Sequence, residues 1–158
     1  MSGVDASGRA EPGTAATSVL FVCTHNSARS IMAEALLRAK GGDGYEVFSA
    51  GTHAGAVRPQ TLQVLEEAGL PTAGLRSKSV KEFMGRRFDF VITVCDRARG
   101  VCPVFPGEGQ RDHWGFDDPS EAEGSEEEQL EAYRQVMRLI GERIDRFLRV
   151  ERRQQTGG

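Results

Sequence analysis

The sequence predicts an α/β fold, a four-stranded parallel sheet flanked by helices in three layers. Strand-like and helix-like patterns alternate along the 158 residues, which is typical of a parallel sheet covered on both faces. The run Val19–Val22 is short and wholly apolar, as expected for a strand buried on both sides. The chain closes on a long stretch with apolar residues three and four positions apart, which indicates an amphipathic helix.

The first half of the chain supplies two strands and two helices. The first predicted helix ends at Gly41 and Gly42. Tyr45–Gly51 is typical of a second strand, and Pro59 opens a second helix that Gly69 stops. The first helix is predicted from apolar residues on one face: Ile31, Met32, Ala35, Leu36 and Ala39.

The second half adds a short helix, two strands and the final helix. A capping box at Ser79–Glu82 predicts the short helix. Phe88–Cys95 reads as a third strand, and the apolar piece Asp112–Phe116 as a fourth. Ser125 and Glu128 cap the final helix. Its apolar face is formed by Leu130, Tyr133, Met137, Ile140, Ile144 and Phe147.

Composition predicts one domain and an ordinary soluble balance. We expect a disordered tail over residues 1–17, a single domain over 18–150 that carries the catalytic residues, and a polar tail over 151–158. The net charge of −3 disfavours nucleic-acid and membrane partners. The chain offers no apolar leader or membrane-length segment, so we expect a cytoplasmic monomer with reduced thiols.

The segment between the first strand and the first helix has the composition of an anion-binding loop. Successive backbone N–H groups in such a turn form a nest, and the helix N-terminus adds positive potential. Arg29 provides a planar fork for a tetrahedral oxyanion, and Asn26 tolerates the backbone angles that the loop needs. We therefore expect Cys23 to be a nucleophile with a lowered pKa. The expected oxyanion-binding residues are Thr24, His25, Asn26, Ser27, Ala28, Arg29 and Ser30.

A second cysteine is expected near the first. Cys23 and Cys95 each end a predicted strand, and parallel strands end at one edge of a sheet. The plainer interpretation of Cys23 is a buried, inert thiol, but an arginine in the first turn of a helix calls for an anionic partner. A zinc site with His25 and His113 is disfavoured because no C-x2-C spacing is present and Arg29 would repel a cation. No metal or cofactor is expected, and His25 is expected to shape the loop mouth.

These residues resemble a known family. "CTHNSARS" is a C-x5-R-S loop after a strand, "SAG" follows the second strand, and "TVCDRARGVCP" follows the third. "HWGFDDP" supplies Asp118 before a proline, with Asp117 beside it as the fallback. Over 18–150 the chain resembles the Rossmann-like low-molecular-weight tyrosine phosphatase fold and, within it, the thioredoxin-coupled arsenate reductases.

The resemblance implies a three-cysteine relay. Cys23 attacks arsenate, Asp118 protonates the leaving oxygen, and Arg29 with the loop amides holds the oxyanions. Cys95 then attacks Cys23, giving a Cys23–Cys95 disulfide and arsenite, and Cys102 attacks Cys95 to give Cys95–Cys102. Thioredoxin reduces that pair. Phosphate or sulfate would also fit the anion loop. Two thiols becoming one disulfide supply the two electrons that arsenic(V) needs.

Other functions are compatible with parts of this pattern. A tyrosine or small-phosphate phosphatase would use only the loop and its acid, leaving Cys95 and Cys102 superfluous. A one-cysteine reductase served by a small thiol and a non-enzymatic redox or oxyanion sensor are further alternatives. Some relatives hold an alkali cation near the loop. Asn26, Glu34 and Ser49 match that site, whereas "SKSV" lacks the expected aspartate, so cation dependence is not expected.

Overall fold

The computed structural model describes residues 16–95, 102 and 109–157. Four strands form one sheet in the order β2-β1-β3-β4, and all three pairings are parallel. The predicted four-stranded parallel sheet flanked by helices is therefore confirmed. The strands are β1 (Thr17–Cys23), β2 (Tyr45–Gly51), β3 (Phe90–Thr93) and β4 (Gln110–His113).

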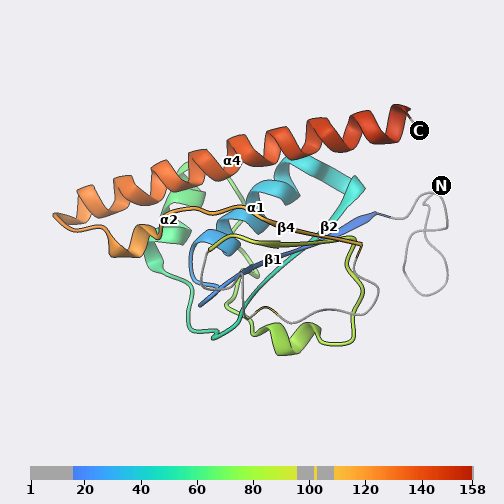
Figure 1. Cartoon of the computed structure of the whole chain (residues 1–158). Coiled ribbons are helices and arrows are strands. Elements are labelled where there is room, and N and C mark those ends of the chain that lie inside the picture. The colour runs from blue at the N-terminus through green and yellow to red at the C-terminus, as the bar shows by residue number, and fades with distance from the viewer. Residues whose placement is uncertain (1–15, 96–101, 103–108, 158) are drawn as a thin grey trace.

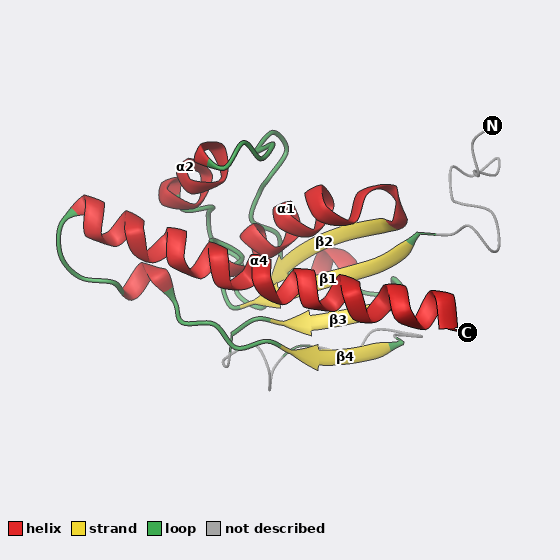
Figure 2. Cartoon of the chain, turned by 90° about the horizontal axis from the view of Figure 1, so that it is seen from above, coloured by secondary structure: helices red, strands yellow, loops and turns green. Residues whose placement is uncertain are grey.

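The central strand β1 fixes where the chemistry occurs. Residues 19–23 of β1 are all buried, which explains their continuous apolar character. The register pairs Cys23 with Gly51 on β2 and Val22 with Thr93 on β3. The strands end at one edge of the sheet, where their arrowheads point in the same direction (Figure 2).

Three helices cover one face of the sheet. In Figure 1 they are α1 (Arg29–Gly41), α2 (Pro59–Glu67) and α4 (Glu126–Gly157), with α4 outermost. Short 3₁₀ helices connect these elements: η1 (Gly42–Gly44), η2 (Val80–Phe83) and η3 (Pro119–Glu121). Among the described residues, η2 is the helical element on the opposite face (Figure 1). No helix in the described part of the chain is long and apolar enough to cross a membrane.

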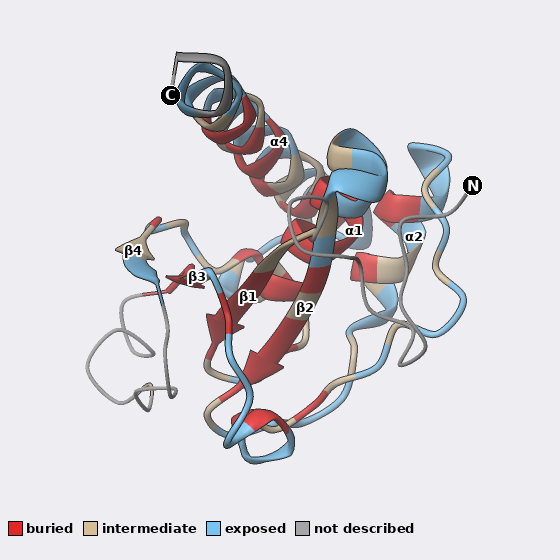
Figure 3. Cartoon of the chain, turned by 90° about the vertical axis from the view of Figure 1, so that its right-hand side faces the viewer, coloured by how far each residue is buried: buried red, intermediate tan, exposed pale blue. Residues whose placement is uncertain are grey.

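Apolar side chains of α4 and the sheet meet in one core. The buried stripe of α4 faces the sheet in Figure 3, and Phe147 contacts the rings of Tyr45, Phe90 and Trp114. Trp114 is buried, as expected for a packing residue. The buried apolar residues of α4 are Leu130, Tyr133, Val136, Ile140, Ile144, Phe147 and Leu148.

The start of α4 was predicted correctly, but its end was not. Ser125 N–H donates to Glu128 Oε1 at 3.0 Å, and Glu128 N–H donates to Ser125 Oγ at 3.1 Å, which is the expected capping box. The helix then continues to Gly157, so most of the expected tail 151–158 is helical. Glu, Arg and Gln are good helix formers, which favours extension of the helix.

Three other predicted elements differ in detail. The third strand is shorter than the expected Phe88–Cys95, and the fourth begins and ends earlier than Asp112–Phe116. The predicted capping-box helix is a 3₁₀ turn in which Ser79 Oγ accepts from Lys81 N–H at 3.1 Å. The acidic member of the box, Glu82, pairs with an arginine instead.

The end of β2 touches the loop that follows β1, and this contact requires a glycine. A Cβ on Gly51 would lie 2.7 Å from Thr24 O and 2.9 Å from Asn26 N. We predict that Gly51→Ala destabilises the fold by about 1–3 kcal/mol, because the backbone of the loop must move. Urea unfolding measures the loss.

Gly44→Ala is the matched control, since a Cβ there meets nothing within 4 Å. Its free energy of unfolding should stay within about 0.5 kcal/mol of the wild type. Equal effects of the two substitutions would contradict the close approach of β2 to the loop.

Candidate active site

The loop between β1 and α1 turns its carbonyl groups outward. Cys23 O accepts from Thr52 N–H at 3.0 Å, and Thr24 O accepts from His53 N–H at 2.7 Å. His25 O accepts from Gly55 N–H at 3.1 Å. Farther along the loop, the carbonyl of residue 27 accepts from the N–H of residue 58 at 3.0 Å. Segments outside the loop therefore hold its peptide planes.

Outward carbonyls direct the following N–H groups inward. In a trans peptide the C=O and the next N–H point in opposite directions, so the N–H groups of Thr24, His25, Asn26 and Ala28 face the inside of the loop. Asn26 N–H is one of them, and it donates to Cys23 Sγ at 3.1 Å. Asn26 has a φ of 52°, the left-handed conformation expected from its residue type. Successive N–H groups that face inward have the geometry of a nest.

The sulfur of Cys23 lies at the floor of this loop. Cys23 is 3% exposed, and its Sγ lies 2.8 Å from Ser30 Oγ. Asn26 Nδ2 donates to Ser30 Oγ at 2.7 Å. Because Ser30 accepts that bond, its own hydrogen is available for the sulfur. Cys23 is thus held by two donors, one from the loop and one from the first turn of α1.

The electrostatics of Cys23 differ from the expectation of a lowered pKa. Burial raises the pKa of the Cys23 thiol above its ordinary value, and nearby Cys95 raises it further. Hydrogen bonds from Ser30 and from the N–H of Asn26 act in the opposite direction. The sequence indicated the donors, but it did not indicate how completely the end of β1 is desolvated.

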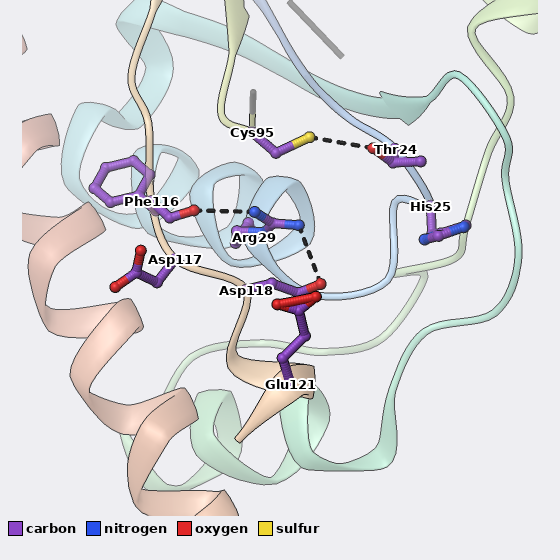
Figure 4. Close-up of a pocket in the computed structure, with 8 residues that line it drawn as sticks. All are labelled: Thr24, His25, Arg29, Cys95, Phe116, Asp117, Asp118 and Glu121. Atoms are coloured by element: carbon purple, nitrogen blue, oxygen red, sulfur yellow. Dashed lines mark hydrogen bonds and ion pairs between the residues drawn. The ribbon is translucent and has the colours of Figure 1, made fainter. Parts of the chain in front are cut away.

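Arg29 and Asp118 face each other across the pocket (Figure 4). Arg29 Nη1 donates to Phe116 O at 2.9 Å, and Arg29 Nη2 lies 3.4 Å from Asp118 Oδ2. Figure 4 shows the carboxylate of Asp117 directed away from Arg29. The geometry therefore favours Asp118 over Asp117 as the carboxylate that works with the loop.

Asp118 is a carboxylate at neutral pH. Burial alone would raise its pKa, but hydrogen bonds from Ser120 and the charges of Arg29 and Arg58 outweigh burial and lower it. Ser120 N–H and Ser120 Oγ donate to Asp118 Oδ1 at 2.9 and 2.7 Å. The side chain is thereby fixed with its other oxygen toward Arg29.

Cys95 lies at the same edge, as predicted from its place at the carboxyl end of a parallel strand. Cys95 is 2% exposed, and its Sγ lies 3.3 Å from Thr24 Oγ1 (Figure 4). Val94 N–H donates to Val22 O at 2.9 Å, which continues the β1–β3 pairing beyond β3. The loop that holds Cys23 therefore also contacts the second thiol.

A pocket of about 260 Å³ brings together Arg29, Asp118 and Cys95, and Cys23 is not among its lining residues. Its lining residues are Thr24, His25, Arg29, Cys95, Phe116, Asp117, Asp118 and Glu121. His25 is exposed and lies at the mouth, as expected. Of the predicted loop residues, Asn26, Ala28 and Ser30 are buried and do not line the pocket, and Ser27 is half-buried.

Cys102, the third predicted thiol, is half-buried and packs against the hydrophobic core. The segment between Cys95 and Cys102 is polar and contains Gly100, a sequence that predicts a conformational switch. Residues 96–101 lie outside the described residues. Among the residues that are described, no group of three or more His, Cys, Asp or Glu side chains could hold a metal ion.

Two members of the pocket, Phe116 and Glu121, could not be recognised in the sequence as site residues. Phe116 contributes its carbonyl, and every residue has a carbonyl, so no side-chain signal could have identified it. Glu121 belongs to η3, which Asp118 caps by accepting from Ser120 N–H. The Asp-Pro pair at 118–119 was the available signal for that turn.

The chain is similar in sequence to proteins of a known family. The model of the family "Low molecular weight phosphotyrosine protein phosphatase" matches residues 18–156. An arsenate reductase of Halalkalibacterium halodurans is 40% identical over 129 residues, covering 82% of this chain and 93% of the relative.

Solved structures give the same relationship. One is an arsenate reductase in the phosphate-binding state, with a TM-score of 0.72, 28% identity, and coverage of 83% of this chain and 95% of the other. Another is a thioredoxin-dependent arsenate reductase of Corynebacterium glutamicum, with a TM-score of 0.56, 32% identity, and coverage of 82% and 62%.

The hydrogen bond of Ser30 can be tested directly. We predict that Ser30→Ala raises the pKa of Cys23, because burial then acts against one donor fewer. At pH 7 the thiolate fraction falls, so alkylation of Cys23 slows. The rate is measured against pH in a background with Cys95 and Cys102 replaced by serine.

Ser79→Ala is the control, because the hydroxyl of Ser79 caps η2. It should leave the alkylation profile unchanged. An unchanged or lowered pKa in Ser30→Ala would show that Ser30 does not stabilise the thiolate.

Proposed function

The chain belongs to the low molecular weight phosphotyrosine protein phosphatase family, and from that premise we propose that it is an arsenate reductase that works by a three-cysteine relay. The observation that carries the proposal is the second thiol in the anion pocket. Cys95 Sγ contacts Thr24 of the loop at 3.3 Å, and a phosphatase has no use for a thiol there. The names of the relatives support arsenate as the oxyanion.

In the proposed first step, Cys23 Sγ attacks arsenic and a water molecule leaves. The inward N–H groups and Arg29 hold the arsenate oxygens. Asp118 donates the proton that the leaving oxygen needs, so it must be protonated in the complex. The arriving anion provides for this, since it competes for Arg29 and places negative charge near Asp118, and both effects raise the pKa of that carboxyl.

In the second step, Cys95 attacks the sulfur of Cys23. The S–As bond breaks, its electron pair goes to arsenic, and arsenite leaves while a Cys23–Cys95 disulfide forms. Cys102 then attacks Cys95, which frees Cys23 as a thiol and leaves a Cys95–Cys102 disulfide. The dithiol of thioredoxin reduces the Cys95–Cys102 disulfide and is itself oxidised to a disulfide.

Exposure supports this order of thiols. Cys23 and Cys95 are 3% and 2% exposed, whereas Cys102 is half-buried. A disulfide is reduced by a thiolate that must reach a sulfur atom. A bulky protein reductant therefore reaches a disulfide most easily when it includes Cys102, the most exposed of the three cysteines. The relay lies within one chain, so a monomer suffices, and it requires a reducing compartment such as the expected cytoplasm.

The coupled assay tests the function. With arsenate, thioredoxin, thioredoxin reductase and NADPH, the protein should oxidise one NADPH per arsenite formed. Cys95→Ser and Cys102→Ser should abolish this steady turnover. Full activity in both variants with a small thiol would favour the one-cysteine reductase. Arsenate-independent hydrolysis of an aryl phosphate that survives in both variants, without arsenate turnover in the wild type, would favour the phosphatase.

The proposed acid gives a second prediction. Asp118→Asn should slow formation of the Cys23–arsenic adduct by roughly 10²–10⁴-fold, the usual contribution of a general acid. Stopped-flow measurement of the first chemical step reports this separately from arsenate affinity. Asp117→Asn is the matched control and should have the smaller effect. A larger effect of Asp117→Asn would show that Asp117, and not Asp118, is the general acid.

A further inference from the structure

Next to Asn26 of the anion loop lies a cluster of charged and polar side chains. Its central carboxylate is Glu34, whose side chain is 4% exposed. Glu34 Oε2 pairs with Arg38, and Glu34 Oε1 lies 3.6 Å from Lys78 Nζ. Ser49 Oγ donates to the same Oε1. None of these residues lines the active-site pocket.

The ammonium group of Lys78 is enclosed by oxygen atoms. Lys78 Nζ donates to Arg76 O at 2.6 Å and to Ser49 Oγ at 3.4 Å, and it faces the carboxylate of Glu34. The Lys78 side chain is 10% exposed. A carbonyl, a hydroxyl and a carboxylate are the ligands that a bound alkali cation prefers, so the ammonium occupies a cation site from within the chain.

A continuous set of hydrogen bonds joins this cluster to the nucleophile. Lys78 N–H donates to Asn26 Oδ1 at 2.7 Å. Asn26 Nδ2 donates to Ser49 Oγ at 3.0 Å and to Ser30 Oγ at 2.7 Å. Ser30 Oγ then contacts Cys23 Sγ at 2.8 Å. Both polar atoms of the Asn26 side-chain amide, Oδ1 and Nδ2, are thereby engaged, at a residue whose φ is already unusual.

We propose that Lys78 is a positioning residue for Cys23, acting as a tethered cation that fixes Glu34 and Ser49 and, through Asn26, the donors on the sulfur. The same ammonium compensates the buried charge of Glu34, which would otherwise be left with Arg38. Since the cation is covalently attached, the wild-type loop needs no cation from solution. The inference rests on Cys23 as the nucleophile of the proposed function.

The cluster can be reached from solution, so the ammonium group of Lys78 can be replaced by an added cation. A second pocket, of about 290 Å³, is lined by Glu34, Lys78 and Arg76 among others. It shares no lining residue with the active-site pocket. An ion from solution can therefore reach the cluster without passing the anion loop.

The experiment compares Lys78→Ala with Lys78→Met in the Cys95→Ser, Cys102→Ser background. Both remove the charge, but only alanine leaves room for an ion. We expect alkylation of Cys23 at pH 7 to slow by roughly five- to thirtyfold in both, as for the loss of a charged hydrogen-bonding group. Ammonium or potassium chloride should restore the rate in Lys78→Ala and not in Lys78→Met. Tetramethylammonium chloride at equal ionic strength, whose cation is too large, should restore neither.

Lys81→Ala is the matched control, since Lys81 is exposed on the neighbouring η2; it and the wild type should ignore the added salt. If Lys78→Ala does not fold without salt, ammonium-dependent recovery of its Tm is the same rescue. An unchanged alkylation profile in both Lys78 variants, or a loss in Lys78→Ala that no cation restores, would overturn the proposal. Alkylation does not require arsenate, so a failure of arsenate turnover would overturn the proposed function and leave this inference standing.

Discussion

The structure depends on a balance at one sulfur atom. Cys23 ends a strand whose last five residues are buried, and burial raises the pKa of its thiol. Donors from Asn26 and Ser30 act against burial. A nucleophile needs the ionised form, so these donors must stay in place. The outward carbonyl bonds, the close approach of Gly51 and the ionic cluster next to Asn26 hold the loop that carries them.

The same loop explains how one pocket can serve two kinds of chemistry. Arg29 and the inward N–H groups suit any tetrahedral oxyanion. Cys95, placed by β3 beside Thr24, adds a second thiol to that site. Under the proposed function, the thiol at the neighbouring strand end allows the anion loop to support reduction of its oxyanion.

Much of the fold could be predicted because its signals are local. The buried run of β1, the capping box of α4 and the strand–helix alternation each follow from short-range preferences. The placement of Cys23 and Cys95 at one edge could be predicted because each ends a strand of a parallel sheet. The raised pKa of Cys23 and the contacts of Lys78 with Glu34 could not be predicted, because both depend on enclosure by segments distant in the sequence. The helical end of α4 was missed because residues 151–157 lack an apolar pattern.

The central claim is that the thiol of Cys95 resolves an adduct on Cys23. It is tested most directly by a single turnover of Cys102→Ser with arsenate, followed by peptide mapping of the arrested protein. The relay predicts that each protein releases one arsenite and retains a Cys23–Cys95 disulfide, because no third thiol is present to attack that disulfide. Release of arsenite without that disulfide would contradict the relay, whatever the rate of turnover in the wild type.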